Sequence, residues 1–479
     1  MTTMKGIATM NSSLKMKTGN SEHPKSNAEH RMPKKLRCWI FNVRCSMFFI
    51  FGLIIASANF AFAEILFLKN AVVHTVSGAP ITNGSVLIQN GKVLVVSDDS
   101  LRTRILIPDG TEEIDLKGLH LYPGLIALNT ALGLSEISGV RSTRDVVEVG
   151  DYTPEVQSWI SVNPDSELLP VARANGITFI EPAPQGGIVA GQSGLIVLSG
   201  WTAEQMAIKK PAALHIYWPG MELDVRPKEM FKDKSKWKSL EDQAKERQEK
   251  LRSLQDFFDE ARAYLKALPE NERPAKIPAW EAMLPFVRGE SPVFVHADET
   301  RQIKAALKWA GTNHLKMVLV GARDAWMLAR EIAAQNIPVV FEHVYSQPAR
   351  DTDRYDVYFR APEILRTNGV KLALGMGAET FDAALVKNLP YTAAQAVAFG
   401  LSEVDALKAI TLFPAEILGV TNRLGSIEVG KDATFFATDG NVFDIRSNVK
   451  RLWIAGKEIN LETRHTRLYE KYKNRPKAK

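Results

Sequence analysis

The chain has 479 residues, of which 45% are hydrophobic and 24% are charged. That composition is typical of a globular protein, and the length suffices for one large domain and one smaller one. The formal net charge is +6. Residues 1–63 hold nine of the 60 basic residues and two of the 54 acidic ones, which leaves 51 basic and 52 acidic residues elsewhere. The basic excess therefore belongs to the N-terminal segment, and we expect no nucleic-acid partner.

The first 63 residues have the pattern of a secretion signal. The basic stretch ends at Arg44, an apolar run covers residues 47–58, and Ala61-Phe62-Ala63 is a small-x-small cleavage pattern. The apolar run is shorter than the about 20 residues that span a bilayer, so an uncleaved membrane anchor is the weaker alternative. We expect a periplasmic or secreted protein that is cleaved after Ala63 and meets the membrane only through this signal. The leader is unusually long, which makes Met32 an alternative start.

Both cysteines, Cys38 and Cys45, lie in the segment that would be removed. We therefore expect the mature chain to contain no thiol. That excludes disulfides, thiol catalysis and thiolate metal sites.

Residues 64–122 have the pattern of a small β-sheet. Short apolar runs such as 65–68 and 85–88 are separated by turns, and Asn90-Gly91 is a strong hairpin signal. Residues 423–461 have the same pattern, so we expect both chain ends to build one small β-sandwich. Residues 462–479 are expected to form a polar tail that is frayed from Tyr469.

Residues 123–422 alternate between apolar runs and segments with helical periodicity. Continuous apolar runs separated by helices predict a parallel sheet that is covered by helices, and the number of units favours an α/β fold of the (β/α)₈ barrel type. The clearest runs cover residues 178–180, 195–198, 292–295, 317–320, 338–341 and 371–374.

A charged insertion over residues 228–268 interrupts this pattern. Its apolar residues recur at steps of three and four, which predicts an amphipathic helix. We expect this helix to lie on the barrel, and the alternative is a lid over the site.

Three stretches carry a family pattern. Residues 116–126 read LKGLHLYPGLI, residues 406–420 include Thr411 and Pro414, and residues 424–433 lead into the last strands. These stretches resemble the amidohydrolase superfamily, close to its imidazolonepropionase-like branch, at the entry into barrel strand one, the exit helix and the return to the small sheet. The likeness covers almost the whole chain after residue 63. It implies a hydrolase of non-peptide C–N bonds in small cyclic amides.

The resemblance also implies a divalent metal such as zinc, held by two strand-one histidines and a histidine on strand six, and an aspartate on strand eight that takes a proton from the attacking water. Only strand five keeps its family residue, as His296. The other matching positions are Ala127, Asn129 and Ala131 on strand one, Gly321-Ala322 on strand six, and residues 375–378 on strand eight. About three protein ligands are needed to hold and activate such a metal. We therefore assign no metal ligand and expect no other cofactor.

The remaining polar residues at strand ends are the candidates for a rearranged site, because barrel sites lie at the carboxyl ends of the strands. We assign catalytic roles to His296, to Glu181 in place of the family's bridging carboxylate, and to Glu342 at the end of strand seven. The alternative is that they form structural hydrogen bonds or a salt-bridged rim.

Four more residues are assigned to substrate binding: Asn129, Gln192, Glu299 and His343. Gln192 lies in the glycine-rich stretch 186–193, which has the spacing of a phosphate loop but lacks its lysine, so we expect no nucleotide there. His215 and His120 receive no ligand role.

Three functions remain open from the sequence. The first is a periplasmic hydrolase of C–N bonds with a rearranged site. The second is an inactive barrel that binds a small molecule or regulates an active homologue. The third is a structural subunit of a larger assembly, such as a homo-oligomer. The family resemblance favours the first, and the missing ligands favour the other two.

Overall fold

The computed structural model describes residues 64–99, 106–267 and 276–476. The predicted signal segment, its cleavage site and both cysteines lie outside these residues. Within the described part, no helix is long and apolar enough to cross a membrane.

Strands from both chain ends form one hydrogen-bonded sheet, as the sequence predicted. Antiparallel pairing of β5 with β14 joins the two ends of the chain. The Asn90-Gly91 turn closes the β2–β3 hairpin with positive φ angles of 51° and 74°, which Asn and Gly tolerate. The strands follow the order β16-β15-β14-β5-β1-β2-β3, with β4 beside β1: β1(Ile65–Val73), β2(Ile81–Gln89), β3(Lys92–Asp98), β4(Glu112–Asp115), β5(His120–Pro123), β14(Phe435–Thr438), β15(Val449–Ile454) and β16(Lys457–Glu458).

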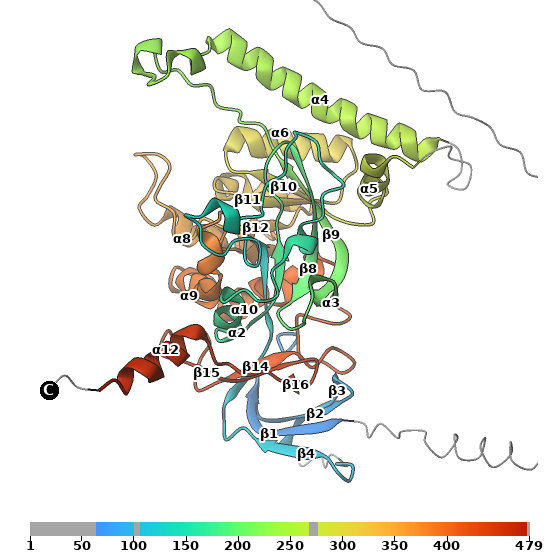
Figure 1. Cartoon of the computed structure of the whole chain (residues 1–479), viewed down its shortest axis with the longest axis vertical. Helices are drawn as coiled ribbons and strands as arrows, with labels where there is room; N and C mark the ends of the chain where they lie inside the picture. The colour runs from blue at the N-terminus through green and yellow to red at the C-terminus, as the bar shows by residue number, and fades with distance from the viewer. Residues whose placement is uncertain (1–63, 100–105, 268–275, 477–479) are drawn as a thin grey trace, which may run out of the picture. The chain divides into compact units, whose positions relative to one another are not determined.

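The second sheet is a nearly closed eight-stranded barrel, which confirms the predicted fold class (Figure 1). Its strands are hydrogen-bonded in chain order: β6(Leu125–Thr130), β7(Ile177–Pro182), β8(Val189–Val197), β9(Ala207–Tyr217), β10(Val293–Ala297), β11(Met317–Gly321), β12(Val339–Phe341) and β13(Leu372–Leu374). All but one run parallel. Buried apolar side chains such as Val295, Leu319 and Val340 fill this sheet, in keeping with its continuous apolar runs.

Strand β8 differs from a regular (β/α)₈ barrel, because it pairs antiparallel with both β7 and β9. Residues 183–188 are the whole connection from β7 to β8. A parallel neighbour needs a crossover of about a dozen residues or more, so this short connection permits only an antiparallel partner.

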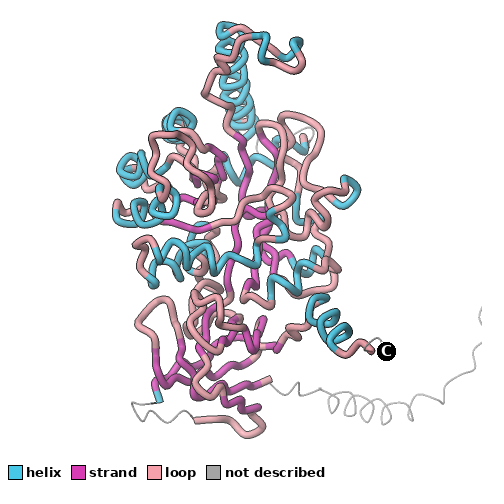
Figure 2. Tube along the Cα trace, turned by 90° about the vertical axis from the view of Figure 1, so that its left-hand side faces the viewer, coloured by secondary structure: helices cyan, strands magenta, loops and turns pink. Residues whose placement is uncertain are grey.

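Helices surround the barrel strands (Figure 2). Helix α6 shows how the sequence builds them: Glu299 and Gln302 form a capping box, and Ile303, Ala306, Leu307 and Ala310 form the buried face. The α-helices of this region are α2(Leu168–Arg173), α3(Ala203–Met206), α5(Pro278–Val287), α6(Thr300–Thr312), α7(Ala329–Ala334), α8(Val357–Thr367), α9(Leu389–Ala398), α10(Glu403–Ala409) and α11(Leu412–Ile417). Short 3₁₀ turns are η2(Arg141–Thr143), η3(Ser158–Ser161), η4(Lys228–Met230), η5(Lys234–Lys236), η7(Ala325–Leu328), η8(Asp382–Ala384) and η9(Val386–Asn388).

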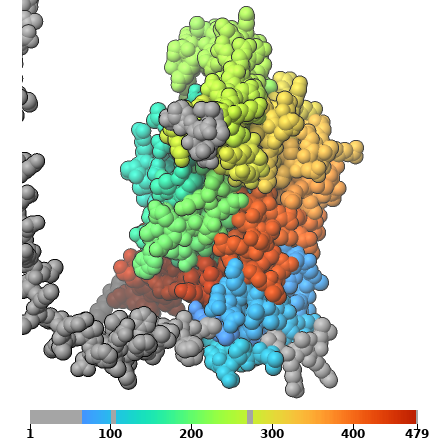
Figure 3. Space-filling view, turned by 90° about the vertical axis from the view of Figure 1, so that its right-hand side faces the viewer, coloured from blue at the N-terminus to red at the C-terminus, as the bar shows by residue number. Residues whose placement is uncertain are grey.

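The predicted insertion helix is α4(Leu240–Lys266). Ser239 caps its first turn, and Leu254, Phe258 and Ala261 are its buried residues. Phe258 packs edge-on against Trp309 of α6, with ring centroids 5.0 Å apart. Most other residues of α4 are exposed, and it lies on the surface as an outer layer over α5 and α6 (Figure 3).

The tail differs from the prediction, because residues beyond the last strand form the helix α12(Arg464–Lys473) instead of a frayed end. Thr463 and Thr466 form a capping box at its start. This local capping explains why a stretch without buried residues is helical.

Candidate active site

A cavity of about 600 Å³ lies at the carboxyl ends of the barrel strands. Asn129, Tyr217, His296, Glu342 and His343 line it, from the ends of β6, β9, β10 and β12. Four of the seven residues assigned from the sequence therefore line this cavity: Asn129, His296, Glu342 and His343. This is the position at which barrel folds place their sites.

A buried chain of hydrogen bonds leads into this cavity. His215 Nε2 lies 2.8 Å from Glu181 Oε1, and His215 Nδ1 lies 3.0 Å from His296 Nε2. Glu181 and His215 are fully buried, whereas His296 lines the cavity. Ser193 Oγ also lies 3.0 Å from His215 Nε2. A fixed carboxylate thus orients one imidazole, which in turn orients a second.

His215 is the residue that the sequence analysis did not select. It lies on β9, and β8 and β10 place Ser193 and His296 on either side of it. Its position in a strand could have identified it, because His215 and Tyr217 are two residues apart and lie on the same face of β9. Both contact His296.

Asn129 extends the chain of hydrogen bonds to Glu342. Its backbone N–H donates to Glu181 Oε2 over 2.7 Å, and its side-chain Nδ2 donates to Glu342 Oε1 over 2.6 Å. Asn129 has a φ of 49°, a left-handed conformation in which asparagine is among the favoured residues. This conformation at the end of β6 places the two groups of one residue on two different carboxylates.

The Glu342 side chain lies beside the end of β13, the eighth barrel strand. A Cβ atom on Gly375 would lie 3.1 Å from Glu342 Oε1, so glycine there leaves room for the carboxyl group. Burial raises the pKa of Glu342 well above its usual value, the hydrogen bond from Asn129 opposes this, and the charges of Asp298, Asp382 and Glu181 add to it. Glu342 is therefore held as a protonated acid to higher pH than a solvated glutamate.

The pKa of His296 is shifted in the opposite direction, downward. Burial, followed by the neighbouring His215, lowers the pKa of His296 well below its usual value, although Asp298 opposes the shift. Its ring stacks on Tyr217 with centroids 4.1 Å apart and planes 13° apart. The Tyr217 hydroxyl donates to Pro184 O over 3.2 Å, and burial together with nearby carboxylates raises the pKa of this phenol. His296 is thus a neutral imidazole that faces the cavity.

The donors present do not fit the family's metal. Ala127, Asn129 and Ala131, in and after the first barrel strand β6, have no imidazole. Residues 375–378, which follow the eighth barrel strand β13, have no carboxylate. The two imidazoles of His215 and His296 are hydrogen-bonded to each other. Among the described residues, no group of three His, Cys, Asp or Glu side chains could hold a metal ion.

Gln192 and Glu299 lie away from the cavity. Gln192 is buried, and its Nε2 donates to Pro154 O and Ala282 O over 3.0 Å each. Glu299 caps the start of α6. Gln192 lies within β8 instead of the expected loop at the barrel mouth, and Glu299 follows β10. Which side chains near a strand end face the lumen depends on strand register and not on residue type.

The sequence and fold of this chain are similar to those of known amidohydrolases. The model of the Amidohydrolase family matches residues 287–459. The fold is similar to the crystal structure of an amidohydrolase from Thermotoga maritima MSB8, with a TM-score of 0.71 and 27% identity over 82% of this chain and 99% of that one. The chain therefore has an Amidohydrolase family match over its C-terminal part and the fold of a solved amidohydrolase.

Two further similarities have lower sequence identity. A second amidohydrolase structure matches with a TM-score of 0.50 and 16% identity over 82% of this chain and 98% of that one, a likeness in fold. The chain is also 22% identical over 407 residues to the amidohydrolase tasK of Hapsidospora irregularis. Those residues are 78% of this chain but 39% of that protein, so the chain spans about two fifths of its length.

Proposed function

We propose that this chain hydrolyses non-peptide C–N bonds of small molecules, such as cyclic amides, without the metal that the family uses. The observation that carries the proposal is the hydrogen-bonded chain from Glu181 through His215 to His296, which ends in the same cavity as Glu342. Burial shifts the pKa values of His296 and Glu342 in opposite directions, which puts a neutral imidazole and a protonated carboxyl group in one cavity, as an acid–base pair requires.

In this proposal His296 is the general base and Glu342 the general acid. His296 accepts a proton from the attacking water, and Glu181 and His215 orient its ring. Glu342 delivers its proton to the departing nitrogen as the C–N bond breaks. The products are a carboxylic acid and an amine, and the proton on His296 then returns to Glu342 through solvent. General acid–base catalysis contributes about 10²- to 10⁴-fold for each well-placed group.

The cavity also favours one charge class of substrate. Besides the protonated Glu342, the acidic residues Asp298, Glu379 and Asp382 line it, and no Lys or Arg is among its described lining residues. A substrate that carries an amine or amidine is attracted by this lining, whereas a carboxylate is repelled. We therefore propose neutral or cationic amides and ureas as the substrate class.

A library of cyclic amides and linear ureas, in cationic, neutral and anionic forms, tests the proposal with the full chain and product detection by mass spectrometry. We expect turnover that persists with a chelator and falls at least about 100-fold in His296→Ala and Glu342→Gln. His465→Ala and Glu470→Gln, both on the exposed helix α12, are matched controls that should keep the activity. Turnover that requires added zinc would contradict the metal-free reaction.

The replaced ligand positions on strands one and eight favour a second candidate, a barrel that binds a small molecule without turnover. The same library distinguishes it by thermal shift. A compound that raises the melting temperature of the wild-type chain, and is recovered unchanged after prolonged incubation, would support binding alone.

A further inference from the structure

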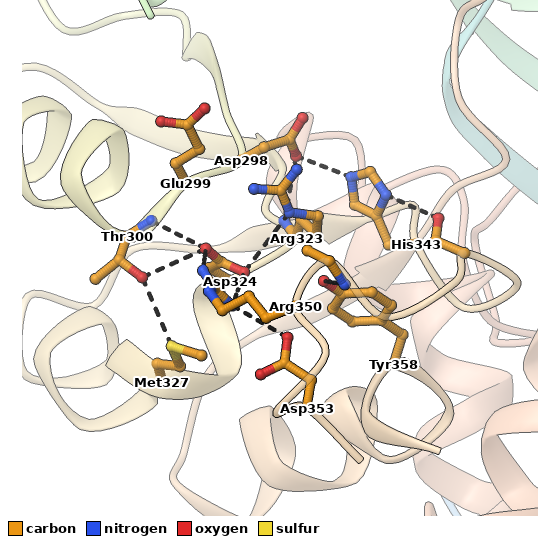
Figure 4. A network of polar contacts seen from close by, with 12 residues as sticks. Asp298, Glu299, Thr300, Arg323, Asp324, Met327, His343, Arg350, Asp353 and Tyr358 are labelled. Carbon is orange, nitrogen blue, oxygen red and sulfur yellow. Dashed lines mark hydrogen bonds and ion pairs between the residues drawn. The ribbon is translucent and has the colours of Figure 1, made fainter. Parts of the chain in front are cut away.

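A second polar arrangement lies in the same cavity, built from Asp298, His343 and Ser346. Figure 4 shows Asp298 and His343 pointing toward each other. His343 Nε2 lies 2.8 Å from Asp298 Oδ1, and His343 Nδ1 lies 3.0 Å from Ser346 Oγ. Asp298 follows β10, and the other two residues follow β12. The acid–base pair proposed above uses none of these three side chains.

The partners of His343 define which nitrogen carries the proton. The pKa of Asp298 lies below its usual value: burial raises it, but the hydrogen bonds from His343 and from the backbone N–H of Arg323 outweigh burial. An ionised carboxylate only accepts hydrogen bonds, so Nε2 carries the proton of a neutral His343. Nδ1 is then the acceptor for the Ser346 hydroxyl, which is the arrangement of an activated serine.

The loop that carries this serine is fixed at several points. Ser346 N–H donates to His343 O over 2.9 Å in a tight turn. Further along, Arg350 pairs with the fully buried Asp324, and Ala349 N–H donates to the Tyr358 hydroxyl over 3.2 Å. Asp324 in turn accepts a hydrogen bond from Thr300 at the start of α6. Such outer contacts hold a reacting group in one geometry.

We propose that Ser346 is a nucleophile that forms an acyl-enzyme with the substrate, with His343 as its base and Asp298 as the residue that positions His343. This inference rests on the proposed hydrolysis and names its covalent step. The geometry resembles a serine–histidine–aspartate triad in roles, although here the serine meets Nδ1 and the carboxylate meets Nε2.

The two groups of residues then divide one reaction. Ser346 Oγ attacks the carbonyl carbon while its proton passes to His343 Nδ1, and Glu342 protonates the nitrogen as the C–N bond breaks. In the second half, water gives a proton to His296 and attacks the ester carbon. The Ser346 oxygen departs and regains its proton from His343, and the proton on His296 returns to Glu342 through solvent.

A fluorophosphonate probe tests the serine without knowledge of the substrate, because an activated serine oxygen displaces its fluoride. We expect one label per full chain, located at Ser346 by peptide mapping and absent in Ser346→Ala. His343→Ala and Asp298→Asn should slow labelling at least about 100-fold. Ser235→Ala is the control: Ser235 is exposed and bonds a carboxylate, Asp233, over 2.7 Å with no imidazole, so it should change nothing.

The failure of this inference is distinct from the failure of the proposed hydrolysis. Absent labelling at Ser346, or labelling that is equal in His343→Ala, would overturn the activated serine. Full hydrolytic turnover by Ser346→Ala would also overturn it while leaving the metal-free hydrolysis intact. Circular dichroism spectra that match the wild type would show that each variant is folded, so that a lost label reports on the site.

Discussion

Removing His215 is the most direct test of the buried hydrogen-bonded chain. His215→Leu fills similar space with an apolar side chain, but it leaves Glu181 Oε1 and His296 Nε2 without their 2.8 Å and 3.0 Å partners. Glu181 and His215 are both 0% exposed, so water does not replace the lost bonds. Breaking one partner of a buried polar pair costs about 3–5 kcal/mol when the remaining group is charged.

The double variant Glu181→Leu/His215→Leu separates this cost from ordinary repacking. It removes the stranded carboxylate, while the backbone N–H of Asn129 loses its acceptor, Glu181 Oε2. Each single variant strands one member of the Glu181–His215 pair, and the double variant strands neither. The double variant should therefore be less destabilised than the sum of the two single variants by about 2–3 kcal/mol.

The assay is urea unfolding of the full chain, followed by tryptophan fluorescence and circular dichroism. Coincident transitions by the two probes justify free energies, and otherwise the midpoints are compared directly. A His215→Leu cost below about 1 kcal/mol, or strict additivity in the double variant, would refute a coupled buried network.

Three further predictions concern the Glu342 carboxyl group, the glycine beside it and the N-terminal segment. Burial raises the pKa of Glu342 well above its usual value, so the folded state binds more protons than the unfolded state once the pH exceeds that usual value. Its stability therefore falls as pH rises. Glu342→Gln should remove this fall, so the urea midpoint of unfolding should change less between about pH 5 and 8 than in the wild type. Gly375→Ala places a Cβ 3.1 Å from Glu342 Oε1 and should lower stability by about 1–3 kcal/mol and turnover with it, whereas Gly139→Ala meets no atom within 4 Å and should do neither. We also propose export with cleavage after Ala63, so intact-mass analysis of the secreted chain should give Glu64 as its first residue, and a retained leader would contradict this.

Most of the fold could be predicted from the sequence, because its signals are local. Continuous apolar runs and helical periodicity predicted the barrel, and the Asn90-Gly91 turn marked the hairpin of the small sheet. The direction of β8 was not predicted, although the short connection 183–188 contained the signal. The capping box at Thr463 likewise turned an expected frayed tail into a helix.

The candidate site was predicted only in part, because a cavity is defined by register and not by residue type. Sequence position selected His296, Glu342, His343 and Asn129, all of which line the cavity. It also selected Gln192 and Glu299, which bond to neighbouring segments or cap a helix. The roles of all these residues stay predictions that the variants above test.

The sequence by itself determined the barrel and the composite sheet, since each depends on residue types at fixed spacings along the chain. Only the tertiary structure decided which polar side chains meet. Glu181, His215 and His296 come from three strands, and Asp298, His343 and Ser346 from two loops. Their hydrogen bonds depend on strand order, on the side of the sheet that each residue faces and on burial, and those quantities exist only once the chain has folded.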